Sequence, residues 1–263
     1  MKHDPYGTGV LSKDIPSESD RLAELEQALD PLSREAIEAL PLPVDARCLD
    51  LAAGRGSISY WMAERFFRGR VTAADIDPRY LDGTRAPNLD VVTFDAREEE
   101  FPKHSFDLVY TRSALKHIPE REEVLARMRD WVRPGGWMVV VDGYWFPSDE
   151  SAHPEWSRVV DAVVRQMESQ GGLMRWTRQL PSRMVRLGLT DMSVKLAPSL
   201  SGWDGWGAQH HEWLRSTVHQ IGPSLVEKAL LTQEELDRFL ATPDSPEMAE
   251  WFGLVAAVVG RVP

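Results

Sequence analysis

A glycine-containing turn preceded by an acid is the first place in the sequence where residue types and spacing could do chemistry. The stretch CLDLAAGRGS places Asp50 a few residues before Gly54 and Gly56. A dinucleotide-binding turn needs glycines at its first, third and sixth positions, and counting from Gly54 the sixth position is Ser59. A carboxylate at such a turn also opposes a phosphate and favours a ligand with positive charge. The turn therefore predicts a site for a cationic ligand.

The elements around this turn alternate between two periodicities. Short apolar, β-branched runs are separated by helix-like segments, which is the pattern of βαβ units on a parallel sheet. Such a sheet binds ligands beyond the carboxyl ends of its strands. We expect an open, doubly wound α/β sheet. The expected strands are RCLDL, RVTAADI, LDVVTF, FDLVYT, GWMVVVDG, TDMSVKL and WFGLVAAVVGRV.

Changes of composition predict four parts of the chain. Residues 1–40 are expected to hold a polar, mobile arm and two helices that serve as a lid or cap, with the second helix beginning at Pro31. Residues 41–200 form the ligand-binding α/β core. Residues 201–248 are an inserted, aromatic-rich helical lid, and residues 249–263 supply the final strand of the core.

Composition excludes several classes of protein. The 263 residues, 43% of them hydrophobic, suffice for one sizeable core. A formal charge of −11 disfavours binding to nucleic acid. The single cysteine, Cys48, stands in an apolar run and indicates a buried thiol. The N-terminus has no apolar signal region, and no run has membrane-spanning length. We expect a soluble, cytoplasmic protein without a membrane partner, and a homo-oligomer is an option that the sequence leaves open.

Five segments between about residues 44 and 142 together resemble the motifs of class I S-adenosylmethionine-dependent methyltransferases. In order, they are LDLAAGRGS, VTAADIDP, FDAREEEFP, FDLVYTRSALKHIPE and WVRPGGWMVVVD. The resemblance implies a seven-stranded, mostly parallel, Rossmann-like methyltransferase fold and S-adenosylmethionine as cofactor, which carries a sulfonium and an ammonium group. The N-terminal helices and aromatic lid resemble those of bacterial natural-product methyltransferases. That resemblance implies a small-molecule acceptor, such as an aromatic secondary metabolite or its precursor, methylated on O, N or C.

The resemblance also assigns cofactor contacts. Asp75 is placed for the ribose hydroxyls, Asp95 for the adenine amino group, and Thr111 or Arg112 for the methionine half. Ala52 stands where the family most often has its first glycine, which leaves open the backbone angle at this position and its effect on cofactor affinity. The complete cofactor-binding set is Asp50, Ala52, Gly54, Gly56, Asp75, Ile76, Asp95, Ala96, Thr111 and Arg112.

Three acidic or basic residues near these strands have structural interpretations. Asp95 could be a surface turn residue. Arg112 could form an ion pair with an acid of the N-terminal helices. Asp77 is expected to cap a helix that begins at Pro78.

A base is the remaining requirement for methyl transfer to a protonated acceptor, besides in-line alignment and exclusion of water. A neutral imidazole, with a pKa near 6.5, suits that task. The candidates are His210 and His211 in the lid, then His117, which could instead be structural, and Tyr6. We predict that His210→Ala or His211→Ala lowers the rate about 10²-fold while cofactor affinity is kept. Neighbouring helical side chains point about 100° apart, so we expect no metal site there.

Two alternatives from other classes remain. The chain could be a catalytically silent protein that binds S-adenosylmethionine on the same fold. It could also be an NAD-dependent oxidoreductase, although the missing third glycine counts against this. The D/N-P-P-Y motif of amino-methylating DNA enzymes is absent, because YTRSALKH follows the fourth strand. Together with the acidic charge, this favours a small-molecule acceptor.

Overall fold

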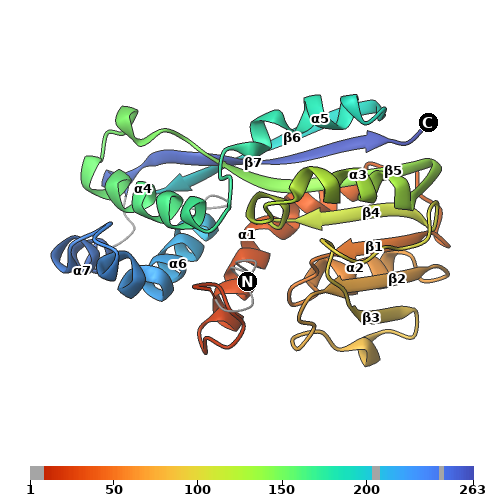
Figure 1. The fold of residues 1–263 in the computed structure, drawn as a ribbon, viewed down its shortest axis with the longest axis horizontal. Helices are drawn as coiled ribbons and strands as arrows, with labels where there is room; N and C mark the ends of the chain where they lie inside the picture. Colours follow the sequence, from red (N-terminus) through yellow and green to blue (C-terminus); the bar gives the residue numbers. More distant parts are fainter. Residues whose placement is uncertain (1–8, 203–207, 243–245) are drawn as a thin grey trace. The chain divides into compact units, whose positions relative to one another are not determined.

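The computed structural model describes residues 9–202, 208–242 and 246–263. Within these ranges, seven strands form one sheet in the order β3-β2-β1-β4-β5-β7-β6 (Figure 1). All seven expected strands are confirmed. They are β1 (Arg47–Leu51), β2 (Arg70–Asp75), β3 (Leu89–Thr93), β4 (Phe106–Arg112), β5 (Val132–Trp145), β6 (Thr190–Ser201) and β7 (Glu250–Arg261).

The sheet is mostly parallel, as the sequence predicts. β1 pairs in parallel with β2 and β4, β2 with β3, and β4 with β5. The Gly135 N–H donates to the Val262 carbonyl, and the Phe146 N–H donates to the Phe252 carbonyl, so β7 runs opposite to β5. Leu51 lies beside Ala74 in β2 and beside Thr111 in β4. The carboxyl ends of the three central strands therefore reach the same edge.

The central strands are mostly apolar and buried without interruption, because both faces of the sheet are covered. Four successive residues of β1, and the first six of β4, are buried. Helix α2 (Ser57–Arg65) packs against β1, β2 and β3, and α3 (Arg121–Trp131) packs against β4. The short helix α5 is Leu180–Arg186.

One long helix, α1 (Glu18–Glu38), replaces the two helices expected at the N-terminus. Pro31 lies inside it, so the predicted start of a second helix there is wrong. Proline removes one helical hydrogen bond. Apolar residues nevertheless stay buried on both sides of it, at helical spacing, and this packing holds the helix together. They are Ala28, Leu29, Leu32, Ala36 and Ile37.

The helix expected at Pro78 does not form. The short connection between β2 and β3 consists of turns and a single 3-10 turn, Gly83–Arg85, which Asp82 caps. Gly83 and a following proline disfavour a longer helix in this connection. Asp77 instead accepts a hydrogen bond from the Arg79 N–H at 3.2 Å.

The chain groups into two compact units, whose boundaries differ from the four expected parts. Unit 1 consists of residues 1–29, 143–175 and 197–255, and unit 2 of residues 30–142, 176–196 and 256–263. Three helices of unit 1 are α4 (Pro154–Ser169), α6 (Ala208–Glu227) and α7 (Gln233–Ala241). The sequence prediction placed α4 in the α/β core, apart from the lid helices with which it groups.

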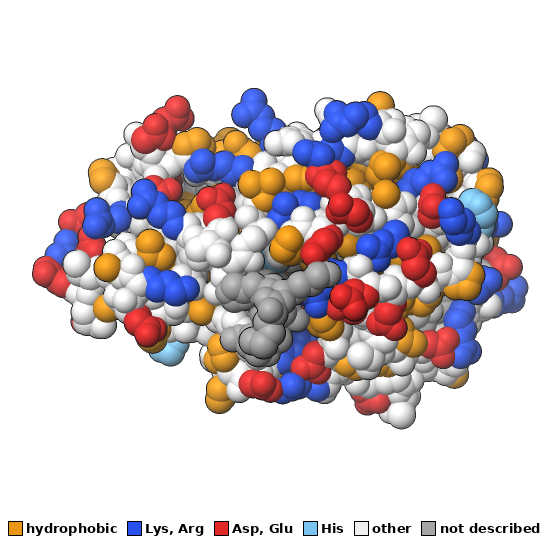
Figure 2. Space-filling view, viewed as in Figure 1, with side chains coloured by type: hydrophobic (Ala, Val, Ile, Leu, Met, Phe, Trp, Pro, Cys, Tyr) orange, Lys and Arg blue, Asp and Glu red, His pale blue; other side chains and the backbone are white. Residues whose placement is uncertain are grey.

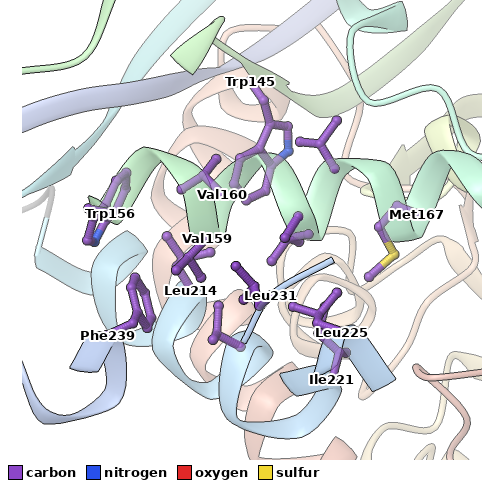
Figure 3. Close-up of a cluster of buried hydrophobic side chains, with 14 of the residues drawn as sticks. Trp145, Trp156, Val159, Val160, Met167, Leu214, Ile221, Leu225, Leu231 and Phe239 are labelled. Carbon is purple, nitrogen blue, oxygen red and sulfur yellow. The ribbon is translucent and has the colours of Figure 1, made fainter. Parts of the chain in front are cut away.

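Buried apolar side chains of these three helices and of the end of β5 form the core of unit 1 (Figure 3). Leu11, in the N-terminal segment, is 2% exposed and belongs to the same core. The mobility expected of the arm from its polar composition stays a prediction, although residues 9–15 form a stretch of hydrogen-bonded turns. Burial of Leu11 supplies the apolar contact that holds it. The labelled core residues are Trp145, Trp156, Val159, Val160, Met167, Leu214, Ile221, Leu225, Leu231 and Phe239.

The surface mixes charges of both signs. Acidic and basic side chains are interspersed over the face drawn in Figure 2. None of the described helices is long and apolar enough to cross a membrane. Across the same residues, His, Cys, Asp and Glu side chains do not gather in threes or more as a metal site would need.

Candidate functional site

The turn after β1 is built from three residues in the left-handed region of φ. These are Ala52 (60°), Gly54 (62°) and Gly56 (86°). The φ of Gly56 favours glycine there, whereas a Cβ would meet only side-chain atoms, the nearest being Leu81 Cδ2 at 2.7 Å. A Cβ on Gly54 would meet no atom within 4 Å. The space beside the Gly54 backbone is therefore open, as close approach of a ligand requires.

Ala52 keeps the backbone angle that a glycine would adopt. Its φ of 60° is strained for an L-residue, which pays about 1–2 kcal/mol in this region. The side chain is exposed. Alanine at this position therefore adopts the left-handed conformation of the turn, at a cost in the free energy of unfolding.

Asp50 lies inside the turn. It is 3% exposed and accepts a hydrogen bond of 2.5 Å from the hydroxyl of Ser59, in the first turn of α2. Ser59 occupies the position where a dinucleotide fingerprint has its last glycine. A hydroxyl there joins the end of β1 to α2, which explains the departure from that fingerprint.

Asp75, at the end of β2, meets the glycine turn directly. Its Oδ2 accepts the Gly54 N–H at 2.8 Å, its Oδ1 accepts the Asp77 N–H at 2.9 Å, and the residue is 6% exposed. The neighbouring Ile76 is 38% exposed and offers an apolar surface at the same strand end. The structure thus brings Asp75 and Ile76 to the turn, as the spacing predicts.

Thr111 and Arg112, at the end of β4, both bind protein groups. The Thr111 hydroxyl donates to the Leu51 carbonyl at 2.8 Å, which ties β4 to β1. Arg112 Nη1 lies 2.6 Å from an oxygen of Asp30 in α1. The structural alternative for Arg112, an ion pair with an acid of the N-terminal helix, is the arrangement observed.

Ser57 completes this ion pair and connects it to the turn. Its hydroxyl donates to Asp30 at 2.8 Å and accepts from Arg112 Nη2 at 3.2 Å. Arg34 Nη2 binds the other Asp30 oxygen at 3.0 Å. Sequence reasoning named no particular acid here, because α1 carries several and only tertiary contact selects one.

Asp95 and Ala96 form the loop after β3 and are held by two arginines. The Arg97 guanidinium spans the Asp95 carboxylate, with Nη2 2.7 Å from Oδ2. Arg127, in α3, donates to the Ala96 carbonyl at 2.8 Å. No sequence pattern marks Arg127, because its two Nη atoms bind backbone carbonyl groups, which every residue carries.

His117 follows β4 in a 3-10 turn and is 9% exposed. Its neighbour Lys116 forms a buried ion pair with Asp142 of β5, at 2.8 Å. Both charged side chains are at most 5% exposed. Sequence reasoning missed this pair, because residues so far apart in the chain share no periodic pattern.

The other proposed bases lie in unit 1 or outside the described residues. His210 and His211 begin α6, in unit 1, and are 1% and 3% exposed. Burial lowers the pKa of His210 to about 4, so this imidazole is a weak base at neutral pH. Tyr6 lies outside the described residues.

Comparison with known proteins agrees with this geometry. Residues 49–140 match the family described as a methyltransferase domain, and this range contains all ten proposed cofactor contacts. Methyltransferase str2 of Strobilurus tenacellus is 33% identical over 142 residues, 49% of this chain and 50% of that protein. Trans-aconitate 2-methyltransferase of Rhodococcus jostii is 31% identical over 136 residues, 51% of this chain and 48% of that protein. The chain thus spans about half the length of these relatives.

Solved structures show the same fold. Phosphoethanolamine N-methyltransferase 2 of Haemonchus contortus, solved with phosphomonomethylethanolamine and S-adenosylhomocysteine, has a TM-score of 0.62 at 16% identity, over 97% of this chain and 59% of that one. The [4+2]-cyclase SpnF has a TM-score of 0.57 at 16% identity, over 90% and 81%. Residues 49–140 thus match a methyltransferase domain, and the solved structures share the fold of the chain.

Proposed function

We propose that the protein transfers a methyl group from S-adenosylmethionine to a small molecule. The observation that carries this proposal is the open space beside Gly54, next to the carboxylate of Asp75. A ligand that approaches the Gly54 backbone meets this acid and the exposed Ile76 at one strand edge. Acid, open glycine and apolar side chain together suit a nucleoside with a cationic amino acid part.

The residues of the turn and the strand ends would divide the binding between them. Asp75 would bind the ribose hydroxyls, and Asp95 the adenine amino group. Gly54 and Gly56 allow the backbone to come close, and Asp50 holds the turn through Ser59. When bound, S-adenosylmethionine supplies an electrophilic methyl group on a sulfonium.

The acceptor is proposed to be a small aromatic molecule. Two of the proteins compared above are named for small molecules, trans-aconitate and phosphoethanolamine. In unit 1, Trp145 contacts Trp213 and Phe252, each at 5.9 Å between ring centroids. These rings pack in or against the core of unit 1, so the proposal of an aromatic acceptor rests on the resemblance to natural-product methyltransferases. Natural-product biosynthesis, a cytoplasmic location and a homo-oligomeric state stay predictions from sequence.

We propose His211 as the base, ahead of His210. A general base works best with a pKa near the operating pH. A pKa of about 4 for His210 falls well below that range. His117 stays a second candidate, since it follows β4 at the carboxyl edge of the sheet.

The test has two stages. Calorimetric titration with S-adenosylhomocysteine measures binding, with NAD as the competing ligand and Asp75→Ala as the control variant. Mass spectrometry with methyl-labelled cofactor then screens phenols, indoles, amines and small carboxylic acids. A labelled product supports the proposal. Binding without product across the panel favours the catalytically silent alternative, and binding of NAD alone favours the oxidoreductase.

A further inference from the structure

The loop of residues 95–100, which follows β3, is closed by aromatic side chains that we call the aromatic base (Phe94, Phe101 and Trp131). The rings of Phe94 and Phe101 stack with their centroids 4.3 Å apart. Trp131, the last residue of α3, packs edge-on against both, at 5.7 and 5.4 Å. Aromatic pairs in these geometries are stabilised beyond their buried area. The base therefore fixes both ends of residues 95–100.

Arg127, one turn before Trp131 in α3, holds the backbone of this loop. Its Nη1 donates to the Ala96 carbonyl at 2.8 Å, and its Nη2 donates to the Arg97 carbonyl at 2.9 Å. Its Nε lies 3.7 Å from the Glu100 carboxylate, and the side chain is 21% exposed. A planar guanidinium can bind two acceptors in a fixed geometry, which a lysine cannot. The orientation of two successive peptide groups is therefore set by α3.

Arg97 in turn fixes the direction of Asp95. Its Nε lies 2.9 Å from Oδ1, its Nη2 lies 2.7 Å from Oδ2, and its backbone N–H also donates to Oδ1 at 2.9 Å. A bidentate pair of this kind restricts the carboxylate to one orientation. Because Arg127 holds the Arg97 carbonyl, the three residues form one connected unit.

We propose that Arg127 is a positioning residue through which the loop selects a 6-amino purine over a 6-oxo purine. The inference rests on the proposed function, in which Asp95 meets the adenine amino group. An amino group donates to a carboxylate, whereas a 6-oxo group turns an acceptor toward it. Rejection of the oxo compound requires that Asp95 cannot turn away. Arg127 supplies this constraint through the peptide groups of Ala96 and Arg97.

Paired titrations test the proposal. Wild type and Arg127→Ala are each titrated with S-adenosylhomocysteine and with its 6-oxo analogue, S-inosylhomocysteine. Wild type is expected to bind the adenine compound at least about tenfold more tightly. In Arg127→Ala this ratio is expected to fall to about threefold or less, through weaker binding of the adenine compound. Arg129→Ala is the matched control, because Arg129 lies in the same helix and, among the described residues, pairs with its neighbour Asp130, at 3.1 Å.

The ratio of affinities separates positioning from general stability. A loss of stability alone weakens both ligands equally and leaves the ratio unchanged, so an unchanged ratio in Arg127→Ala overturns the proposal. If that variant does not fold, Arg127→Gln takes its place under the same criterion. If wild type binds both ligands equally, the proposal fails while the proposed function stands. If wild type binds neither, both fail.

Discussion

Replacing Asp75 by alanine should damage both the glycine turn and cofactor binding. The carboxylate accepts two backbone N–H groups, those of Gly54 and Asp77, at 2.8 and 2.9 Å. The residue is 6% exposed, so alanine would leave these donors without an acceptor in a place that water reaches poorly. The same oxygens are those proposed to meet the ribose.

The magnitude follows from these contacts. A hydrogen bond to a charged group contributes about 1.5–3 kcal/mol, and two at the lower limit give a loss of about 3 kcal/mol in the free energy of unfolding. Loss of the ribose contacts and of the ordered turn should weaken S-adenosylhomocysteine binding by about 1–3 kcal/mol, which is about 5- to 150-fold in Kd. Asp75→Asn keeps one acceptor oxygen and should lose about half as much in each measurement.

The assay combines urea denaturation with calorimetric titration on all three proteins. Measuring both distinguishes the two roles of the carboxylate. Lower stability with wild-type affinity would restrict Asp75 to the turn and remove it from the binding site. Wild-type values for both quantities would refute the inference drawn from the two hydrogen bonds.

Four further results are expected. Ala52→Gly should raise the free energy of unfolding by about 0.5–1 kcal/mol, because the strain relieved in the folded chain exceeds the free-energy cost of the added entropy of the unfolded chain. A lower urea midpoint would contradict this. The pKa of His210 is about 4 in the folded chain and 6.5 in the unfolded chain, so the unfolded chain binds a proton first as pH falls. The contribution of His210 to the free energy of unfolding is therefore present above pH 6.5 and should fall by about 2 kcal/mol by pH 5. Urea midpoints for His210→Leu should lack that drop, and an identical profile would remove His210 as its cause. Asp30→Ala, which removes the carboxylate from the poorly exposed Arg112, should cost about 1–3 kcal/mol in urea denaturation, against less than 1 for Arg34→Ala at the more exposed partner. Equal losses would count against the network. His211→Ala should slow single-turnover methyl transfer about 10²-fold with unchanged cofactor affinity, and a wild-type rate would place the base elsewhere.

The parts of the fold that the sequence predicts are those with local causes. Strands such as β1 and β4 are rich in apolar residues because both of their faces are buried, and this requirement acts on consecutive residues. Asp75 is the last residue of β2, so its approach to the turn after the neighbouring strand β1 follows from the parallel arrangement alone.

The features that sequence missed depend on contacts between distant residues. Pro31 indicates a helix boundary locally, yet burial of the residues on either side keeps α1 continuous. Asp30 binds the side chain of Arg112, and Arg127 binds the carbonyl groups of Ala96 and Arg97. These partners come together only when the chain folds. The grouping of α4 with α6 and α7 likewise reflects packing of their apolar faces, which leaves no mark at a domain boundary.

The buried pair of Lys116 and Asp142 limits the routes by which this protein can change over generations. Removing Asp142 alone leaves the buried Lys116 ammonium without its carboxylate, which costs about 3–5 kcal/mol, whereas replacing both residues by apolar ones of similar size is often neutral or stabilising. Descendants that change one residue at a time must pass through a poorly folded intermediate. The pair is therefore expected to persist by epistasis even where its charges do nothing for chemistry, so its presence in related sequences would not by itself mark a catalytic role.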